Sequence, residues 1–293
     1  MLLIKKYAFS IPFLIVFIIF CLQLAAFFQD PPLILSIEPK AIGHIILATI
    51  TVLLTSMFFL IAATLAQEWK VALVVLPAII ASSLLFLSFP YNIMFAIVSS
   101  LACAFTYFLL QIQLKTYFSF HANHILIPLI KHLVTLLLFA ASICYFISAN
   151  ENIKQHGFTL PPSLLDAVLQ ISAAQDPLGQ INQLEQLKQN PQLLKELNIS
   201  QDELNQLTKP QNQVSSQALK AAIGAQLQNS LKPYLSLIPF ILAFLFFITI
   251  KSLTSLFSLF LYPLIWFIFY VLEKVKVTTY TTETREVKKL IVA

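Results

Sequence analysis

The stretch QINQLEQLKQNPQLLKELNISQDELNQL, Gln180–Leu207, is the centre of the one long polar segment in this chain. That segment runs from Asn150 to Lys232, between long apolar runs. Leucine and isoleucine recur in it at helical spacing, and Ser200 with Glu203 has the form of a capping box. Prolines divide the segment, so we predict several short amphipathic helices rather than one coiled coil. Residues 150–232 are therefore expected to form a helical insertion outside the membrane.

The composition places the rest of the chain in a membrane. Hydrophobic residues make up 58% of the sequence and charged residues 11%, against about 45–50% and about 25% in ordinary soluble domains. So few charges could not cover a water-soluble fold of this size. Among the 18 basic residues, Arg285 is the only arginine, and the lysines flank apolar runs. This distribution is typical of topology signals, not of a nucleic-acid-binding face.

Apolar runs of membrane-spanning length predict five spans before the insertion. They are Tyr7–Phe28, Ala41–Ala66, Val71–Ser88, Ile93–Ile112 and Leu133–Ala149, the last beginning near Pro128. The mixed aromatic and cationic residues just before the fifth span suit the headgroup layer.

The apolar run after the insertion would be about 60 Å long as one helix, which is too long for a single crossing. A turn at Lys251 would give two spans, Tyr234–Ile250 and Ser255–Leu272, and would keep that lysine out of the bilayer centre. The predicted fold is an all-α polytopic transmembrane bundle of about seven spans, with the insertion between spans 5 and 6. Its regions are residues 1–149, 150–232, 233–272 and 273–293.

The charge in the short loops favours a cytoplasmic N-terminus and an extracytoplasmic insertion. In the seven-span topology, Lys5, Lys6, Lys70, Lys115, Lys131 and Lys251 fall inside and only Lys40 falls outside. The basic tail, 273–293, contradicts this count because seven spans place it outside. Either the tail is external despite its charge, or one predicted span does not cross. The alternation of Val275, Val277 and Thr279 is a weak strand signal in this tail.

Three cations near apolar runs are the candidate site residues. Lys131 and His132 enter the fifth span, and Lys251 interrupts the last apolar run. Their ordinary role is to extend toward lipid phosphates at the membrane surface. The alternative is a specific contact to a lipid headgroup or to an anionic substrate.

No residue pattern predicts catalysis, a cofactor or a metal site. His121 and His124 share one helical face, but no third ligand stands near them in the sequence. Cys21, Cys103 and Cys144 each lie inside an apolar run, where cysteine packs as a small apolar residue. No Asp or Glu falls inside a predicted span, which argues against a carboxylate proton relay.

Three functions follow from this pattern. We expect a structural, assembly or interaction role in the cell membrane, with residues 150–232 as the surface for a protein partner. The alternative is a transporter or channel for a small molecule or lipid, with the insertion as an external lid and with hydroxyls as its polar path. Those hydroxyls are Thr49, Thr51, Thr55, Ser56, Ser82, Ser83, Ser99 and Ser100. A membrane enzyme would depend on Asp30, Glu38 and Glu151, which lie in no known motif.

Overall fold

The computed structural model describes residues 9–66, 70–116, 121–158, 160–164, 166–167 and 232–278, and within these the regular elements are all helices. The α-helices are α2 (Ser10–Gln29), α3 (Pro39–Ala66), α4 (Lys70–Phe86), α5 (Tyr91–Thr116), α6 (Ala122–His156), α12 (Ile238–Phe257) and α13 (Leu261–Lys274). Three short 3₁₀ helices complete the set, namely η1 (Pro31–Leu35), η2 (Lys232–Tyr234) and η3 (Ser258–Phe260). The predicted class, an all-α membrane bundle, is confirmed.

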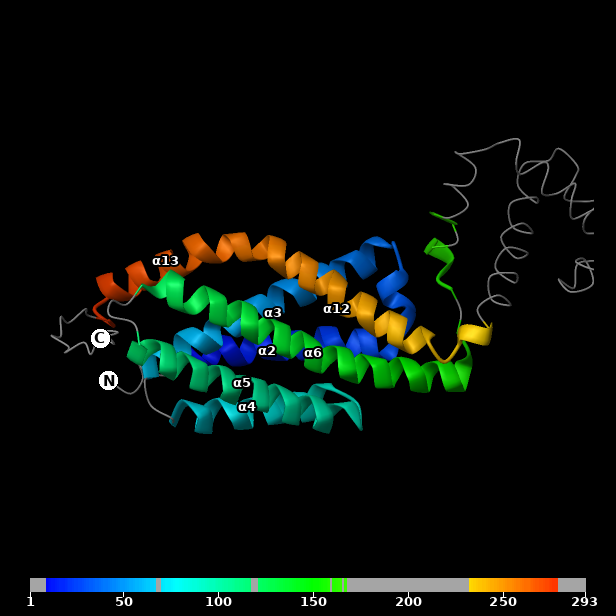
Figure 1. Cartoon of the computed structure of the whole chain (residues 1–293), viewed down its shortest axis with the longest axis horizontal. Coiled ribbons are helices and arrows are strands. Elements are labelled where there is room, and N and C mark those ends of the chain that lie inside the picture. The colour runs from blue at the N-terminus through cyan, green and yellow to red at the C-terminus, as the bar shows by residue number, and fades with distance from the viewer. Residues whose placement is uncertain are drawn as a thin grey trace, which may run out of the picture.

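The helices lie side by side along the long axis of the bundle, and successive helices run in opposite directions, except that α13 continues in the direction of α12 (Figure 1). Among the described residues, five helical segments are long and apolar enough to cross a membrane, and α4 is a shorter apolar helix. We call the end where α2 and α6 begin and α13 ends the terminal end. The other end, where α6 ends and α12 begins, is the insertion end. The chain is thus an integral membrane protein by the length and composition of its helices.

Phenylalanines of α2 form one side of the core because their spacing places them on a single face. Phe13, Phe17, Phe20, Leu24 and Phe27 follow one another at intervals of three and four residues, and each is at most 1% exposed. Phe17 and Phe20 contact Phe95 of α5, with ring centroids 6.3 and 6.2 Å away. The aromatic residues of the first helix therefore fix its packing against α5.

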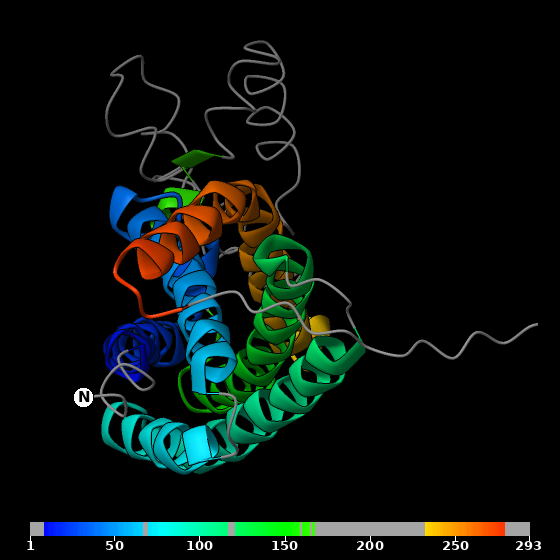
Figure 2. The same cartoon turned by 90° about the vertical axis from the view of Figure 1, so that its left-hand side faces the viewer.

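Helices α3 and α6 lie in the middle of the bundle, between the α4–α5 pair and the α12–α13 segment (Figure 2). The buried face of α3 includes small side chains, among them Ala48, Ser56, Ala62 and Ala63. Small residues let helix backbones approach closely in a membrane, where apolar burial alone drives little association. The exposed apolar side chains of the outer helices are compatible with contact to lipid.

The predicted turn at Lys251 is wrong, and with it the two-span hairpin in residues 233–272. Lys251 lies inside α12, and the helix continues through η3 into α13 as one segment, Ile238–Lys274. The bend comes later, at η3, for a local reason. Pro263 has no N–H for the carbonyl of Leu259, and its ring crowds that carbonyl. The 3₁₀ turn η3 accommodates the missing hydrogen bond.

Replacing the hairpin with one helix also removes the charge conflict of the tail. Lys274 and Lys276 now lie at the terminal end, with Lys115 at the end of α5. Lys40 and Lys154 lie at the insertion end. With the shorter α4 counted, the described helices run along the bundle six times. This arrangement gathers most basic residues of the short loops at one end. Which side of the membrane that end faces remains a prediction.

Other boundaries differ from the predicted ones by several residues. Helix α6 begins at Ala122 rather than near Pro128, and it continues past Asn150 to His156. Gly157 then ends it with a φ of 76°, and its N–H donates to the carbonyl of Ile153. Within the insertion, residues 162–164 and 166–167 are helical, which fits the short helices expected in this segment. The other predicted helices of the insertion lie outside the described residues.

The predicted strand in the tail is contradicted as far as the structure describes it. Residues 275 and 276 form a turn, in which the N–H groups of Val275 and Lys276 donate to the carbonyls of Val271 and Glu273. Lys276 has a φ of 55°, in the left-handed region where helices commonly end. Val275 and Val277 follow a helix C-terminus, and the closing hydrogen bonds of the helix determine the conformation there.

Candidate functional site

Lys251 and Thr135 meet across the seam between α12 and α6. The ammonium of Lys251 donates a hydrogen bond to the hydroxyl of Thr135. Lys251 lies about 20 Å along the helix from Ile238, and Thr135 lies about 20 Å from Ala122. Since the hydrocarbon layer is about 30 Å thick, both residues are far from either polar end of the bundle. A lysine at the centre of a membrane helix costs about 2.5–3.5 kcal/mol on insertion scales.

Lys131 stands one helical turn before Thr135 on the same face of α6. The Thr135 hydroxyl donates to the carbonyl of Lys131 over 2.7 Å, so this hydroxyl both donates and accepts. Lys131 is exposed and Lys251 is half-buried. The structure therefore brings together two of the three candidate residues, although they lie far apart in the sequence.

His132 is not part of this pair. Helix geometry turns it toward α5, where its ring centroid lies 5.8 Å from that of Phe105. The side chain is exposed on the outer surface of the bundle. Adjacent residues of a helix point in different directions. His132 therefore does not join the site of Lys131, although the two residues are neighbours in the sequence.

No carboxylate of the described residues lies at the depth of the lysine pair. The described acids are Asp30, Glu38, Glu151, Asp166 and Glu273, all near helix ends or beyond them. A membrane lysine is usually paired with an acid or with backbone carbonyls. The lysine pair has a threonine hydroxyl instead, so a net positive charge lies between α6 and α12.

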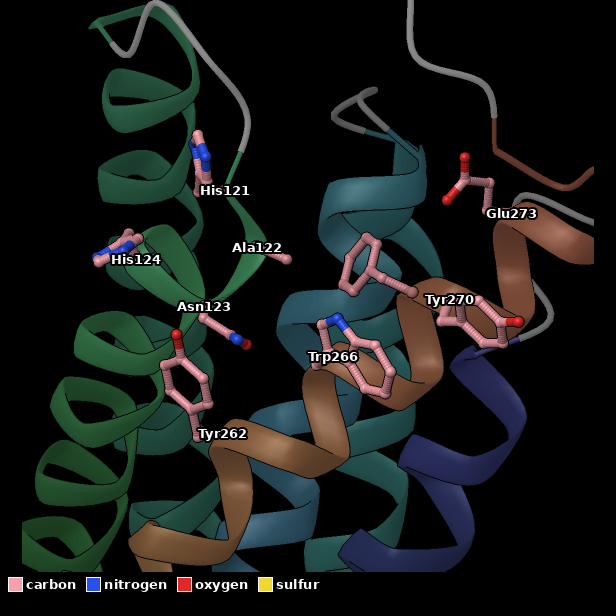
Figure 3. Close-up of a pocket in the computed structure, with 9 residues that line it drawn as sticks. His121, Ala122, Asn123, His124, Tyr262, Trp266, Tyr270 and Glu273 are labelled. Carbon is pink, nitrogen blue, oxygen red and sulfur yellow. The ribbon is translucent and has the colours of Figure 1, made fainter.

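A pocket of about 300 Å³ opens at the terminal end, between the first turn of α6 and the face of α13 (Figure 3). Its lining residues are His121, Ala122, Asn123, His124, Tyr262, Trp266, Phe269, Tyr270 and Glu273. Trp266 and Tyr270 stack with centroids 5.6 Å apart, and Lys274 lies over the Tyr270 ring at 5.6 Å. Asn123 Oδ1 is buried and has no hydrogen-bond partner in the described structure.

The sequence pattern did not lead us to predict the aromatic side of this pocket. Tyr262, Trp266 and Tyr270 recur every four residues, so they share one face of α13. That spacing was available, but the run was interpreted only as apolar. The two histidines considered as metal ligands do lie here, with ring centroids 6.0 Å apart. Within the described residues, no cluster of three or more potential metal ligands occurs.

The insertion end is held together by hydrogen bonds between segments far apart in the sequence. The Tyr145 and Ser148 hydroxyls of α6 donate to the carbonyls of Pro31 and Phe28. The Tyr91 hydroxyl donates to Glu151 Oε2. These bonds connect the C-terminal part of α6 to the C-terminus of α2 and to the start of α5. They hold the helices together at the insertion end.

The start of the insertion also touches the bundle. The hydroxyl oxygens of Ser36 and Ser163 lie 3.1 Å apart, and the N–H of Ile37 donates to Ser163 over 3.4 Å. Ser36 follows η1 directly. The first part of the insertion therefore rests on the loop between α2 and α3.

Most hydroxyls considered as a polar path are bonded to their own helices. They donate to carbonyls four residues earlier, as Thr49 does to Ile45 and Ser83 does to Ile79, over 2.7 and 2.8 Å. Thr51, Ser56, Ser82 and Ser99 do the same. Thr55 and Ser100 have buried hydroxyls without a described partner. A hydroxyl that satisfies its own backbone offers little to a passing solute.

Comparison with known proteins gives no match to any family model, curated protein or solved structure.

Proposed function

We propose that this integral membrane protein is an anchored assembly component that holds a protein partner through residues 150–232. The observation that carries the proposal is the bonding at the insertion end. There, Tyr145, Ser148 and Tyr91 brace the helices, and Ser163 contacts Ser36 at the root of the insertion. A rigid base at the root of a polar segment suits the presentation of that segment to a partner.

The arrangement of the bundle supports this role over transport. Its core is filled by aromatic and aliphatic side chains, and most candidate path hydroxyls are bonded to their own helices. The largest polar part of the sequence is the insertion.

The test is capture of the tagged full-length protein from its native membrane, with crosslinking before solubilisation. A stoichiometric partner crosslinked to residues 150–232 is the expected result. The variant I181Q/L184Q/L187Q should lose that partner, because it removes one apolar stripe of the insertion. The matched variant Q183A/Q186A changes the polar face of the same stretch and should retain it.

Two results would contradict the proposal. One is a protein purified alone or only as a homo-oligomer after crosslinking. The other is retention of every crosslinked partner when residues 168–231 are replaced by a flexible linker of Gly and Ser. Either result would favour transport, and flux assays would then follow.

A further inference from the structure

The seam between α6 and α12 places two positive charges together inside an apolar layer. Lys251 reaches across the seam to Thr135, and Lys131 lies one turn away on the same face of α6. Two positive charges near each other repel, and a low dielectric strengthens that repulsion. An anion or water that compensates the charges would therefore stabilise the arrangement. No acid of the described residues is positioned to do so.

The surroundings of the pair indicate where such an anion comes from. Phe139 lies one turn after Thr135 and is 55% exposed, and Ile248 lies about one turn before Lys251 and is 41% exposed. These side chains face lipid on the outer surface, not a closed cavity. A ligand that reaches the lysines from this surface therefore has apolar parts of its own.

In the other direction, one face of α6 leads from the pair toward the terminal pocket. His124, Lys131 and Thr135 stand on this face at intervals of seven and four residues, with Ile127 and Pro128 between His124 and Lys131. His124 lines the pocket together with Tyr262 and Trp266 (Figure 3). A polar headgroup that extends from the lysines along this face toward the pocket would meet the polar groups there.

We propose that Lys131, Thr135 and Lys251 form a binding site for the phosphate of an acidic membrane lipid. Lysine ammonium groups bind phosphate through charge-assisted hydrogen bonds. Besides the N–H that Lys251 donates to Thr135, the two ammonium groups supply up to five N–H donors. The Thr135 hydroxyl positions one of them. Chains of the lipid would lie against the exposed apolar side chains of α6 and α12. The inference is independent of the partner-binding role of the insertion.

The experiment is native mass spectrometry of the full-length protein in detergent, titrated with phosphatidylglycerol or with phosphatidylcholine of the same chains. We expect the wild type to bind phosphatidylglycerol about tenfold more tightly than phosphatidylcholine. K131M/K251M should lose this preference, and K131R/K251R should keep most of it. The control K40M/K154M removes two exposed charges at the insertion end and should behave like the wild type.

A second measurement keeps both lysines, in case the double methionine variant does not fold. Ser255 is exposed one turn after Lys251, so S255C carries an environment-sensitive fluorophore beside the site. In vesicles of equal parts of the two lipids, brominated phosphatidylglycerol should quench it more strongly than brominated phosphatidylcholine. Equal quenching by the two lipids, or a wild type that binds both equally, would overturn the proposal.

Inorganic phosphate distinguishes the two sources of the same anion. If the site belongs to a lipid, inorganic phosphate should not displace phosphatidylglycerol from the purified protein. Displacement by inorganic phosphate, lost in K131M/K251M, would reject the assignment to a lipid in favour of a soluble phosphate ligand.

Discussion

Tyr145 of α6 stacks on Phe246 of α12 with ring centroids 4.8 Å apart, while its hydroxyl donates to the carbonyl of Pro31. One side chain thus joins α6 to α12 by packing and to η1 by a hydrogen bond. Phe246 in turn contacts Phe27 edge-on at 5.3 Å. The helices before and after the insertion meet at this cluster, near the insertion end.

Substitution at Tyr145 separates these two contributions to stability. Y145F keeps the stacking and loses the hydrogen bond, which leaves the Pro31 carbonyl without this donor, and we expect a cost of about 1–2 kcal/mol. Y145A also opens a cavity and should cost about 3–5 kcal/mol. Thermal unfolding in mild detergent measures both. Equal losses for the two variants would show that the ring contributes nothing beyond its hydroxyl.

The two described glycines should respond to alanine in opposite directions. Gly157 has a φ of 76°, which an alanine adopts only with strain, so G157A should lower the unfolding free energy by about 1 kcal/mol. Gly43 lies within α3, and nothing stands within 4 Å of an added Cβ. G43A should raise stability by up to about 1 kcal/mol. Each variant is the control for the other in the same melting assay.

Thr55 offers a test of an unsatisfied buried hydroxyl. Its side chain is 1% exposed and its Oγ1 has no described partner. T55V has nearly the same shape and should be neutral or stabilising, by up to about 1 kcal/mol. T49V should cost slightly more, because Thr49 donates to the carbonyl of Ile45. A large loss in T55V would indicate that the hydroxyl has a partner such as water, and would strengthen the case for a polar path.

Labelling of single cysteines discriminates the six-pass bundle from a seven-span topology. Cys21, Cys103 and Cys144 are buried, so the native thiols should remain silent toward a membrane-impermeant maleimide. N190C in the insertion and K276C after α13 should then react from opposite sides of sealed vesicles. Reaction of both cysteines from the same side would support the seven-span topology, in which residues 233–272 form a hairpin. Reaction of N190C from outside intact cells would place the insertion outside.

The sequence predicted the class, the order of the helices and most of their extents, because apolar runs of spanning length dominate each helix. It failed at Lys251, where the cost of an intramembrane lysine argued for a turn. The structure accepts that lysine through Thr135, a contact across 116 residues that no local pattern reveals. The extension of α6 to His156 was also missed, since polar residues after Asn150 resemble a loop although they continue a helix beyond the apolar layer.

The pairing of α6 with α12 has a consequence for the evolution of the insertion. Both of its attachment points belong to helices that pack against each other, so the bundle itself brings the two ends together. Extra residues between such fixed ends add little closure entropy, about 0.6 kcal/mol for each doubling of length. The segment can therefore lengthen, shorten or be exchanged at little cost to the stability of the helix bundle. Its sequence can change with the molecule that it binds.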